Sequence, residues 1–295
     1  VGAFGLNNEL KVGGWTTIAD LSYSHAKRDE VTAEAYAGPK VPSGFSSTSI
    51  NLNGVPQFVP TIDWSDPTKV QLQQFWGQMA SARFFTVTDE MKGLKLGAKK
   101  DLNWGAINQF ETGLNYGERS KDYKAVKDAY DLKSGATSLA FPSGLLMSPA
   151  TLGFGAIPKV ANFDVQALLD TGLFSARADD LSSAPNRQWA VKEKITTAYG
   201  KFNLDFKAGV PVRGNLGLQV VHADQTGSGL AWIDNGTMPV SGGKAYTDVL
   251  PSLNLVAEMG SDTNLRFGLA KVVARPNMED MRAGVTSIGR STTGK

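Results

Sequence analysis

The chain has 295 residues, of which 41% are hydrophobic, and its 30 basic and 28 acidic side chains leave a net charge of +2. This balance excludes a general electrostatic attraction to nucleic acid. Cysteine is absent, which excludes disulfides, thiolate metal sites and cysteine nucleophiles. No apolar run approaches the ~18–20 residues of a membrane-spanning helix. Transmembrane strands alternate apolar and polar residues instead, so they are compatible with the mean hydropathy of −0.19.

Alternation of apolar and polar residues is the main local pattern of the chain. In the stretch 265–273, for example, Leu265, Phe267 and Leu269 alternate with Arg266 and Gly268. Such alternation predicts a strand with one apolar and one polar face. We predict about eight strands, each close to the ~9–11 residues that cross a bilayer at a tilt. In chain order they occupy 2–9, 15–25, 94–102, 107–116, 195–206, 215–223, 252–259 and 265–273.

The predicted connections alternate in length along the chain. Short links are expected at 10–14, 103–105, 207–213 and 260–264, and long links at 27–88, 118–188 and 226–245. Up-and-down barrels of the outer membrane have tight turns at one end and long loops at the other. The alternation therefore favours a transmembrane barrel wall over a sandwich. Trp15, Trp104 and Phe206 lie beside short links, as an aromatic girdle at a membrane interface would.

Two stretches inside the long links have helical spacing. In 63–79, Asp66 and Pro67 make a helix start, and Leu72, Phe75 and Trp76 follow at helical intervals. The stretch 162–174 has a similar pattern. Because of this spacing, we predict a short helix in each stretch. Long loops with structure of their own usually serve a function.

Three stretches in the second half of the chain carry a family resemblance. They read KITTAYGKFNLDF (194–206), VPVRGNLGLQVVHADQTGSG (210–229) and YTDVLPSLNLVAEMGSDTNLRFGLAKVVARPNMEDMRAG (246–284). Together with ADLSYSHAKRD (19–29), they resemble the barrel of TonB-dependent outer-membrane receptors. Within these, the likeness is to the proteobacterial subgroup linked to carbohydrate uptake. It covers most of the chain, is strong over 190–284 and is faint inside the two large loops.

The resemblance implies an all-β fold, in which residues 1–295 are part of one outer-membrane β-barrel domain. They would form an antiparallel transmembrane β-barrel segment of about eight strands from a 22-stranded barrel, with long extracellular loops. The sequence contains no plug domain, coupling box or final barrel strand, so we expect an internal part of a larger receptor. The implied partners are a small-molecule ligand, the plug domain, the TonB–ExbB–ExbD system and outer-membrane lipid.

The residues predict recognition and no catalysis. Only His25 and His222 are present, no nucleophile elbow occurs, and we expect neither a cofactor nor a metal. Sugars bind to aromatic platforms flanked by amides and carboxylates. Substrate-binding candidates are therefore the loop-side tryptophans Trp64, Trp189 and Trp232 and the polar-row residues Glu111, Asn115, Gln219 and Arg266. We assign Trp76 to packing within its own predicted helix.

The leading hypothesis is a receptor that takes up a scarce solute across the outer membrane with energy supplied through TonB. A passive porin-like channel and a soluble β-rich carbohydrate-binding domain are the alternatives. The identity of the solute stays open among oligosaccharide, iron–siderophore and cobalamin, with oligosaccharide favoured by the resemblance alone.

Overall fold

The computed structural model describes residues 1–40, 48–52, 57–151, 159–178, 187–233, 236–283 and 285–288. The chain divides into two compact units. Unit 1 contains residues 1–29, 86–124 and 181–295, and unit 2 contains residues 30–85 and 125–180. The fold is all-β, and the strand pairs are antiparallel with one exception that involves the last strand.

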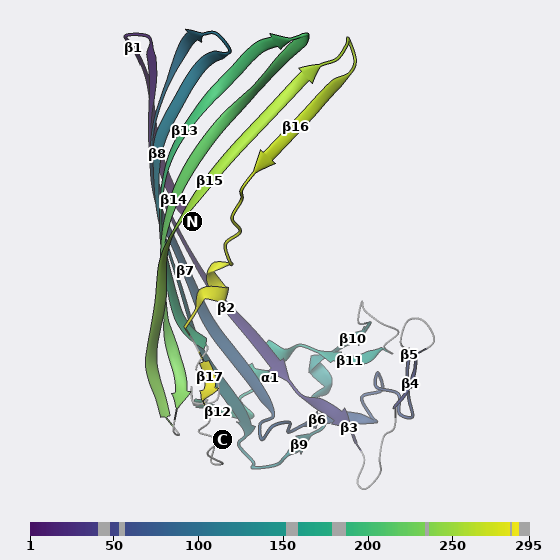
Figure 1. The fold of residues 1–295 in the computed structure, drawn as a ribbon. Coiled ribbons are helices and arrows are strands. Elements are labelled where there is room, and N and C mark those ends of the chain that lie inside the picture. The colour runs from purple at the N-terminus through teal and green to yellow at the C-terminus, as the bar shows by residue number, and fades with distance from the viewer. Residues whose placement is uncertain are drawn as a thin grey trace, which may run out of the picture. The chain divides into compact units, whose positions relative to one another are not determined.

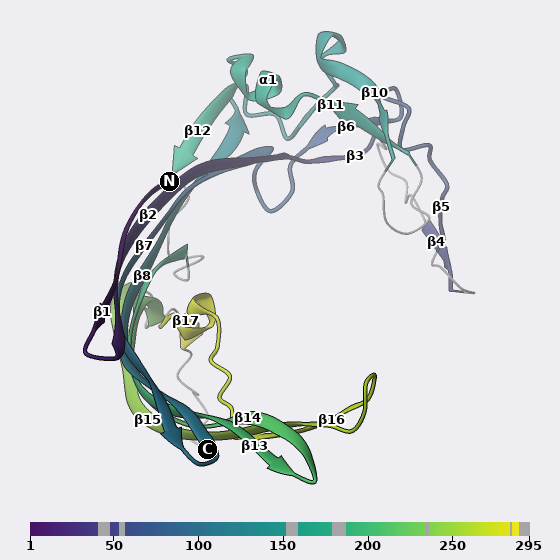
Figure 2. The same cartoon turned by 90° about the horizontal axis from the view of Figure 1, so that it is seen from above.

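Unit 1 is built on eight strands that follow each other in sequence order across one sheet. Figure 1 shows them side by side, and Figure 2 shows that this sheet curves without closing. The first and last strands form its two edges. The strands are β1 Gly2–Val12, β2 Trp15–Ala35, β7 Ala80–Trp104, β8 Ile107–Leu132, β13 Gln188–Ala208, β14 Val210–Ile233, β15 Gly236–Glu258 and β16 Asn264–Ala270.

All eight predicted strands are present in the predicted order, but the predicted lengths are wrong for most of them. The six strands from β2 to β15 have 21 to 26 residues each. Apolar–polar alternation marks only the part of each strand that lies next to a short link. Farther along, polar residues project from both faces, so the sequence pattern no longer identifies a strand although backbone pairing continues.

The predicted short links are confirmed, whereas one predicted long link is wrong. Tight connections join β1 to β2, β7 to β8, β13 to β14 and β15 to β16. The stretch 226–245 is not a loop, because β14 and β15 stay paired from Thr226↔Gly243 to Ile233↔Gly236. This part is rich in Gly and Ser, which removes the alternation, but small side chains do not prevent backbone pairing.

Strand register separates two faces of the unit 1 sheet. The apolar face carries continuous rows of large hydrophobic side chains, such as the row that crosses five strands through Leu216. The polar face carries Asn215, Gly217 and Gln219 of the same strand. On the apolar face, Phe267 and Leu269 are 55% and 66% exposed. The row through Leu216 consists of Phe110, Phe202, Leu216, Leu253 and Leu269.

Unit 2 contains short elements in addition to the ends of β2, β7 and β8. It has a buried core of seven residues, and Leu72 at its centre is 1% exposed. The core residues are Val70, Leu72, Met79, Leu132, Phe141, Leu168 and Phe174. The short elements are β3 Ala37–Pro39, β4 Thr48–Asn51, β5 Gln57–Pro60, β6 Val70–Gln73, β9 Ser138–Leu139, η1 Ser143–Leu145, β10 Leu146–Ala150, β11 Val160–Phe163, α1 Val165–Asp170 and β12 Phe174–Ala178.

The helix predicted over 63–79 is wrong. Val70 and Leu72 are buried at alternate positions of β6, which pairs with β3 and β9. Trp76 and Gly77 have φ values of 52° and 74°, which close a tight turn between Phe75 and Gln78. Strand pairing and this turn therefore override the helical spacing of the apolar residues.

The helix predicted within 162–174 is confirmed as the short α1. Its first turn is capped by Asp164, whose side chain accepts a hydrogen bond of 2.9 Å from the amide of Ala167. Leu168 anchors the helix in the core of unit 2. In the described part of the chain, no helix has the length and apolar character needed to cross a membrane.

The chain turns back onto the sheet of unit 1 after β16. The strand predicted over 265–273 ends at Ala270, and the chain then forms the 3₁₀ helix η4 Met278–Met281. It continues into β17 Val285–Ile288, which pairs in parallel with the end of β14. We call residues 271–283 the strap. Its side-chain contacts fall on the polar face of β13, as described below.

Candidate functional site

The polar face of unit 1 holds a groove of about 310 Å³ that is formed by β7, β8, β13, β14 and β15. Three of the predicted substrate-binding residues, Glu111, Asn115 and Gln219, line this groove together. The residues around them are Lys95, Thr197, Tyr199, Gly200, Lys201, Gly217, Leu218 and Ser252. Because every second residue of a strand projects to the same face, register alone brings these distant positions together.

Tyr199 provides the aromatic surface of the groove. In the sequence it interrupts the apolar alternation, and the register explains why, since it lies directly opposite Gly113 on the polar face. A Cβ placed on Gly113 would collide with the Tyr199 ring and with the backbone of Leu96. The absence of a side chain at Gly113 therefore lets the ring lie against the neighbouring strand. Tyr199 Oη donates a 3.4 Å hydrogen bond to Glu111.

Charge in the groove is balanced by a direct ion pair. Lys201 Nζ lies 2.9 Å from a carboxylate oxygen of Glu111 on the adjacent strand. Both side chains are partly exposed, so this pair orients the carboxylate more than it stabilises the fold. Asn115 Oδ1 is shielded from solvent and accepts no hydrogen bond from the described residues. The amide of Asn115 therefore borders the groove with an acceptor that no described group uses.

A row of amide side chains crosses the polar face next to the groove, on the side of the short links. Asn203 Nδ2 donates a 2.7 Å hydrogen bond to Gln109, and Asn254 Nδ2 donates a 3.1 Å hydrogen bond to Asn215. Gln109 in turn donates to Asp101 over 2.7 Å. These bonds orient the amide groups along one border of the groove.

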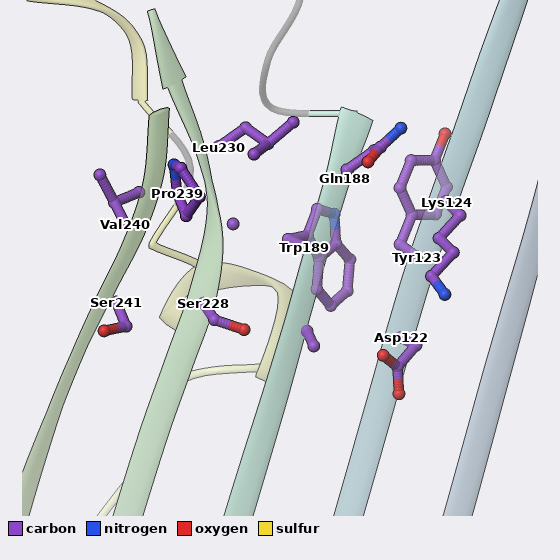
Figure 3. Close-up of a pocket in the computed structure, with 12 residues that line it drawn as sticks. Asp122, Tyr123, Lys124, Gln188, Trp189, Ser228, Leu230, Pro239, Val240 and Ser241 are labelled. Carbon is purple, nitrogen blue, oxygen red and sulfur yellow. The ribbon is translucent and has the colours of Figure 1, made fainter. Parts of the chain in front are cut away.

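Trp189 lines a second groove, of about 360 Å³, near the opposite end of the same strands. Figure 3 shows its indole beside Tyr123 of the neighbouring strand. The two rings are stacked, with centroids 5.6 Å apart and an interplanar angle of 15°. Asp122, Gln188 and Ser228 contribute polar groups. Trp189 was predicted to be a loop-side platform, and in the structure it belongs to β13 with 6% exposure.

The remaining predicted residues do not join these grooves. Trp64 lines an apolar depression of about 320 Å³ in unit 2, with Pro39, Val70 and Val160 among its neighbours. Arg266 belongs to the edge strand β16 and is exposed on the polar face, outside the grooves named here. The backbone of Trp232 pairs with Thr237, but its side chain lies outside the described residues.

Sequence reasoning missed Tyr199, Lys201, Thr197 and Ser252 as groove residues. Each belongs to a predicted strand or lies beside one, but only register aligns it with Glu111 and Gln219. The interruption at Tyr199 was the one available signal. An aromatic residue in a polar row that faces a glycine on the next strand marks a ring laid across the sheet.

The apolar face is bounded along the strands by an aromatic row near the short links and by polar rows at its other end. Near the short links, Trp15, Trp104, Phe110 and Phe202 line one hydrophobic depression, and the Lys100 ammonium lies 5.5 Å from the Trp15 ring centroid. At the other side, Thr196 pairs with Tyr116 and His222 in one row. His222 Nδ1 lies 2.9 Å from the Thr247 hydroxyl. The next row brings charged side chains, with Lys192 at 2.8 Å from Glu118.

The two grooves offer hydrogen-bond donors, acceptors and aromatic surfaces. Within the described residues, no three His, Asp or Glu side chains come together as metal ligands. Comparison of the chain with models of protein families, with curated proteins and with solved structures finds no match among any of them.

Proposed function

We propose that this chain forms part of the wall of an outer-membrane β-barrel of the TonB-dependent receptor kind, which takes up a scarce solute. The observation that carries the proposal is the bounded apolar face of unit 1. Large hydrophobic side chains such as Phe4, Leu218 and Leu269 are about half exposed on it or more, whereas Val212 at its lower limit is 8% exposed. Water-exposed domains rarely expose a continuous apolar surface of this extent.

The height of the apolar face supports a bilayer as its partner. His222, in the bordering polar row, lies ten positions along β14 from Val212, which is opposite Ala257. At about 3.4 Å per residue and a tilt of about 45°, this distance spans about 24 Å across the membrane. Barrels of the outer membrane present an apolar band about 25 Å tall, flanked by aromatic residues. The full strands of 21 to 26 residues would extend beyond this band on one side.

The open edges at β1 and β16 support a wall that belongs to a larger barrel. In lipid, every backbone amide and carbonyl at a sheet edge requires a partner. Further strands would supply those partners, and the polar face with its groove would then line the lumen. A 22-stranded barrel with a plug and coupling to the TonB–ExbB–ExbD system is the form that the sequence resemblance favours.

The polar groove is the proposed contact for solute within this wall. Tyr199, the amide of Asn115 and the paired Glu111 and Lys201 suit a ligand with many hydroxyl groups. Oligosaccharides have this chemistry. A ferric siderophore is the second solute class, and a passive porin-like channel is the second mechanism.

The test uses the complete protein in its host. Cells that carry or lack it are fractionated, and uptake of a labelled oligosaccharide panel and of ferric siderophores is measured with and without TonB. We expect the protein in the outer membrane and TonB-dependent uptake of an oligosaccharide. Uptake that persists without TonB would favour the porin. Recovery of the protein in the buffer-soluble fraction would overturn the proposal.

Matched variants test the groove separately. Asn115→Ala and Gln219→Ala should weaken solute binding by about 1–3 kcal/mol, as loss of a buried contact usually does. Asn254→Ala changes an amide on the same face that is already hydrogen-bonded to Asn215 outside the groove. If all three variants bind the solute equally well, the groove is not its contact.

A further inference from the structure

The strap is held to the sheet by the side chain of Met278, with Met281 beside it, and by a close backbone contact at Gly227. At its start, the amide of Lys271 also donates a 3.0 Å hydrogen bond to the carbonyl of Pro251. Met278 is 9% exposed and packs with Trp189 and Val191, while Tyr123 and Met281 complete the cluster. By strand alternation, Tyr123, Trp189 and Val191 project to the same face as the polar groove. Figures 1 and 2 both place η4 on the concave side of the unit 1 sheet.

Gly227 lies directly under the strap backbone. A Cβ placed on this residue would collide with the carbonyl oxygen of Met281 and crowd the amide of Ala283. Its partner across the ladder, Gly242 of β15, has open space where a Cβ would be. The two glycines are paired and lie on the same face of the sheet. Only Gly227 has to be a glycine for the strap to contact this face.

Between the Lys271 hydrogen bond and Met278, the strap is weakly attached. Residues 271–277 are exposed throughout, and Arg275 is followed by Pro276, which cannot donate a backbone hydrogen bond. Within η4, Glu279 and Arg282 pair with each other over 3.1 Å. Few buried contacts and an exposed backbone are the features of a segment that opens locally.

We propose that the strap is a displaceable lid, latched by Met278, that controls access of solutes to the polar face of β8, β13 and β14. In the closed position it covers Val191, which is 1% exposed, and the strap side of Trp189. When Met278 leaves its pocket, this aromatic and aliphatic surface becomes available to solute. The inference goes beyond the proposed function, because a lid on this face can be tested whatever the solute is.

The test measures access to the covered surface. Val191→Cys, a nearly isosteric change in a chain without cysteine, is introduced into the complete protein. The rate of its reaction with a sulfonated maleimide, which cannot cross membranes, is then measured. We expect slow labelling in the otherwise unchanged protein. Added Gly227→Val, which pushes the strap away, should accelerate labelling about tenfold or more, because reaction of a buried thiol follows local opening.

Matched controls separate the lid from general loosening of the sheet. Gly242→Val adds the same side chain at the partner position, where it meets nothing, and should leave the labelling rate unchanged. Met278→Ala should accelerate labelling, and Met278→Leu, which refills the pocket, should not. Equally fast labelling with and without Gly227→Val would overturn the proposal, because the strap would then not cover the site.

Absence of labelling in Met278→Ala as well as in Gly227→Val would overturn it in the opposite way, because the strap would then be a fixed part of the wall. Failure of the proposed function gives a different result. A protein that does not locate to the outer membrane can still show the full pattern of labelling rates, and a transported solute is not needed for any arm of this experiment.

Discussion

Unit 1 and unit 2 treat their apolar side chains in opposite ways. In unit 2, residues such as Leu72, Met79 and Leu168 gather in a closed core and are nearly inaccessible. In unit 1, residues such as Leu216, Leu218 and Leu269 project from one face of the sheet and stay about half exposed or more. The same residue type is therefore used for internal packing in one unit and for an outward surface in the other.

The largest effect that we predict is inside the core of unit 2. Leu72→Ala should destabilise this unit by about 2–5 kcal/mol, because the change removes buried methyl groups and leaves a cavity. Hydrogen exchange of residues 64–73 in the complete protein, followed by mass spectrometry, measures the loss. Met147→Ala in the same unit, where the side chain is 56% exposed, is the control and should have little effect. Equal effects of the two changes would mean that unit 2 has no closed core.

The next effect concerns the apolar face of unit 1. Leu218→Arg should destabilise the complete protein by roughly 2–4 kcal/mol in lipid vesicles, the cost of an arginine at the lipid face of a barrel. The neighbouring Gln219 points to the polar face, so Gln219→Arg should cost much less. Folding titrations in urea compare the two variants. A cost for Gln219→Arg as large as that for Leu218→Arg would mean that the faces are assigned the wrong way round.

The smallest effect is a pH dependence of the segment 63–70 in unit 2. Hydrogen bonds from the hydroxyl and the amide of Thr68 hold the pKa of Asp66 below its usual value of 3.8. Asp63 has a lowered pKa for the same reason through Ser65. A carboxylate with a lowered pKa stabilises the fold above its unfolded value and loses that contribution as the pH falls through the folded value.

Hydrogen exchange of residues 63–70 should therefore speed up as the pH drops below about 4, after correction for the intrinsic pH dependence of exchange. Asp63→Asn together with Asp66→Asn should flatten this dependence. Asp262→Asn, in the turn between β15 and β16 of unit 1, is the control and should leave it unchanged. A dependence that survives the double change would assign it to other groups.

The sequence predicted the parts of the fold where one face of each strand is apolar and the other is polar. Alternation located all eight strands of unit 1, because an apolar face imposes a period of two on each strand. It failed from Thr226 to Ala245, where glycine and serine leave no apolar face although the ladder continues. Helical spacing gave a wrong prediction at Leu72, Phe75 and Trp76. These residues belong to a strand and a tight turn, where their spacing along the chain does not decide the backbone conformation.

The grooves were only partly predictable because they depend on register and on chain reversal. Glu111, Asn115 and Gln219 were identified from their polar rows, but nothing local to each strand aligns them with Tyr199 and Lys201. Trp189 was taken as an open platform, whereas the strap covers part of it in the structure. The strap itself was unpredictable, since the alternation of 265–273 indicates a strand that continues past Ala270.

The orientation of the two faces of β14 is the central claim, and it can be measured directly. Spin labels are placed one at a time at positions 212–222 of the complete protein in lipid vesicles. Their collisions with oxygen, which concentrates in lipid, and with a water-soluble nickel chelate are compared. We predict oxygen maxima at Leu216, Leu218 and Val220, which are 38–49% exposed, with minima at the odd positions between them. Nickel collisions at the even positions that equal or exceed those at the odd positions would contradict a lipid-facing apolar surface.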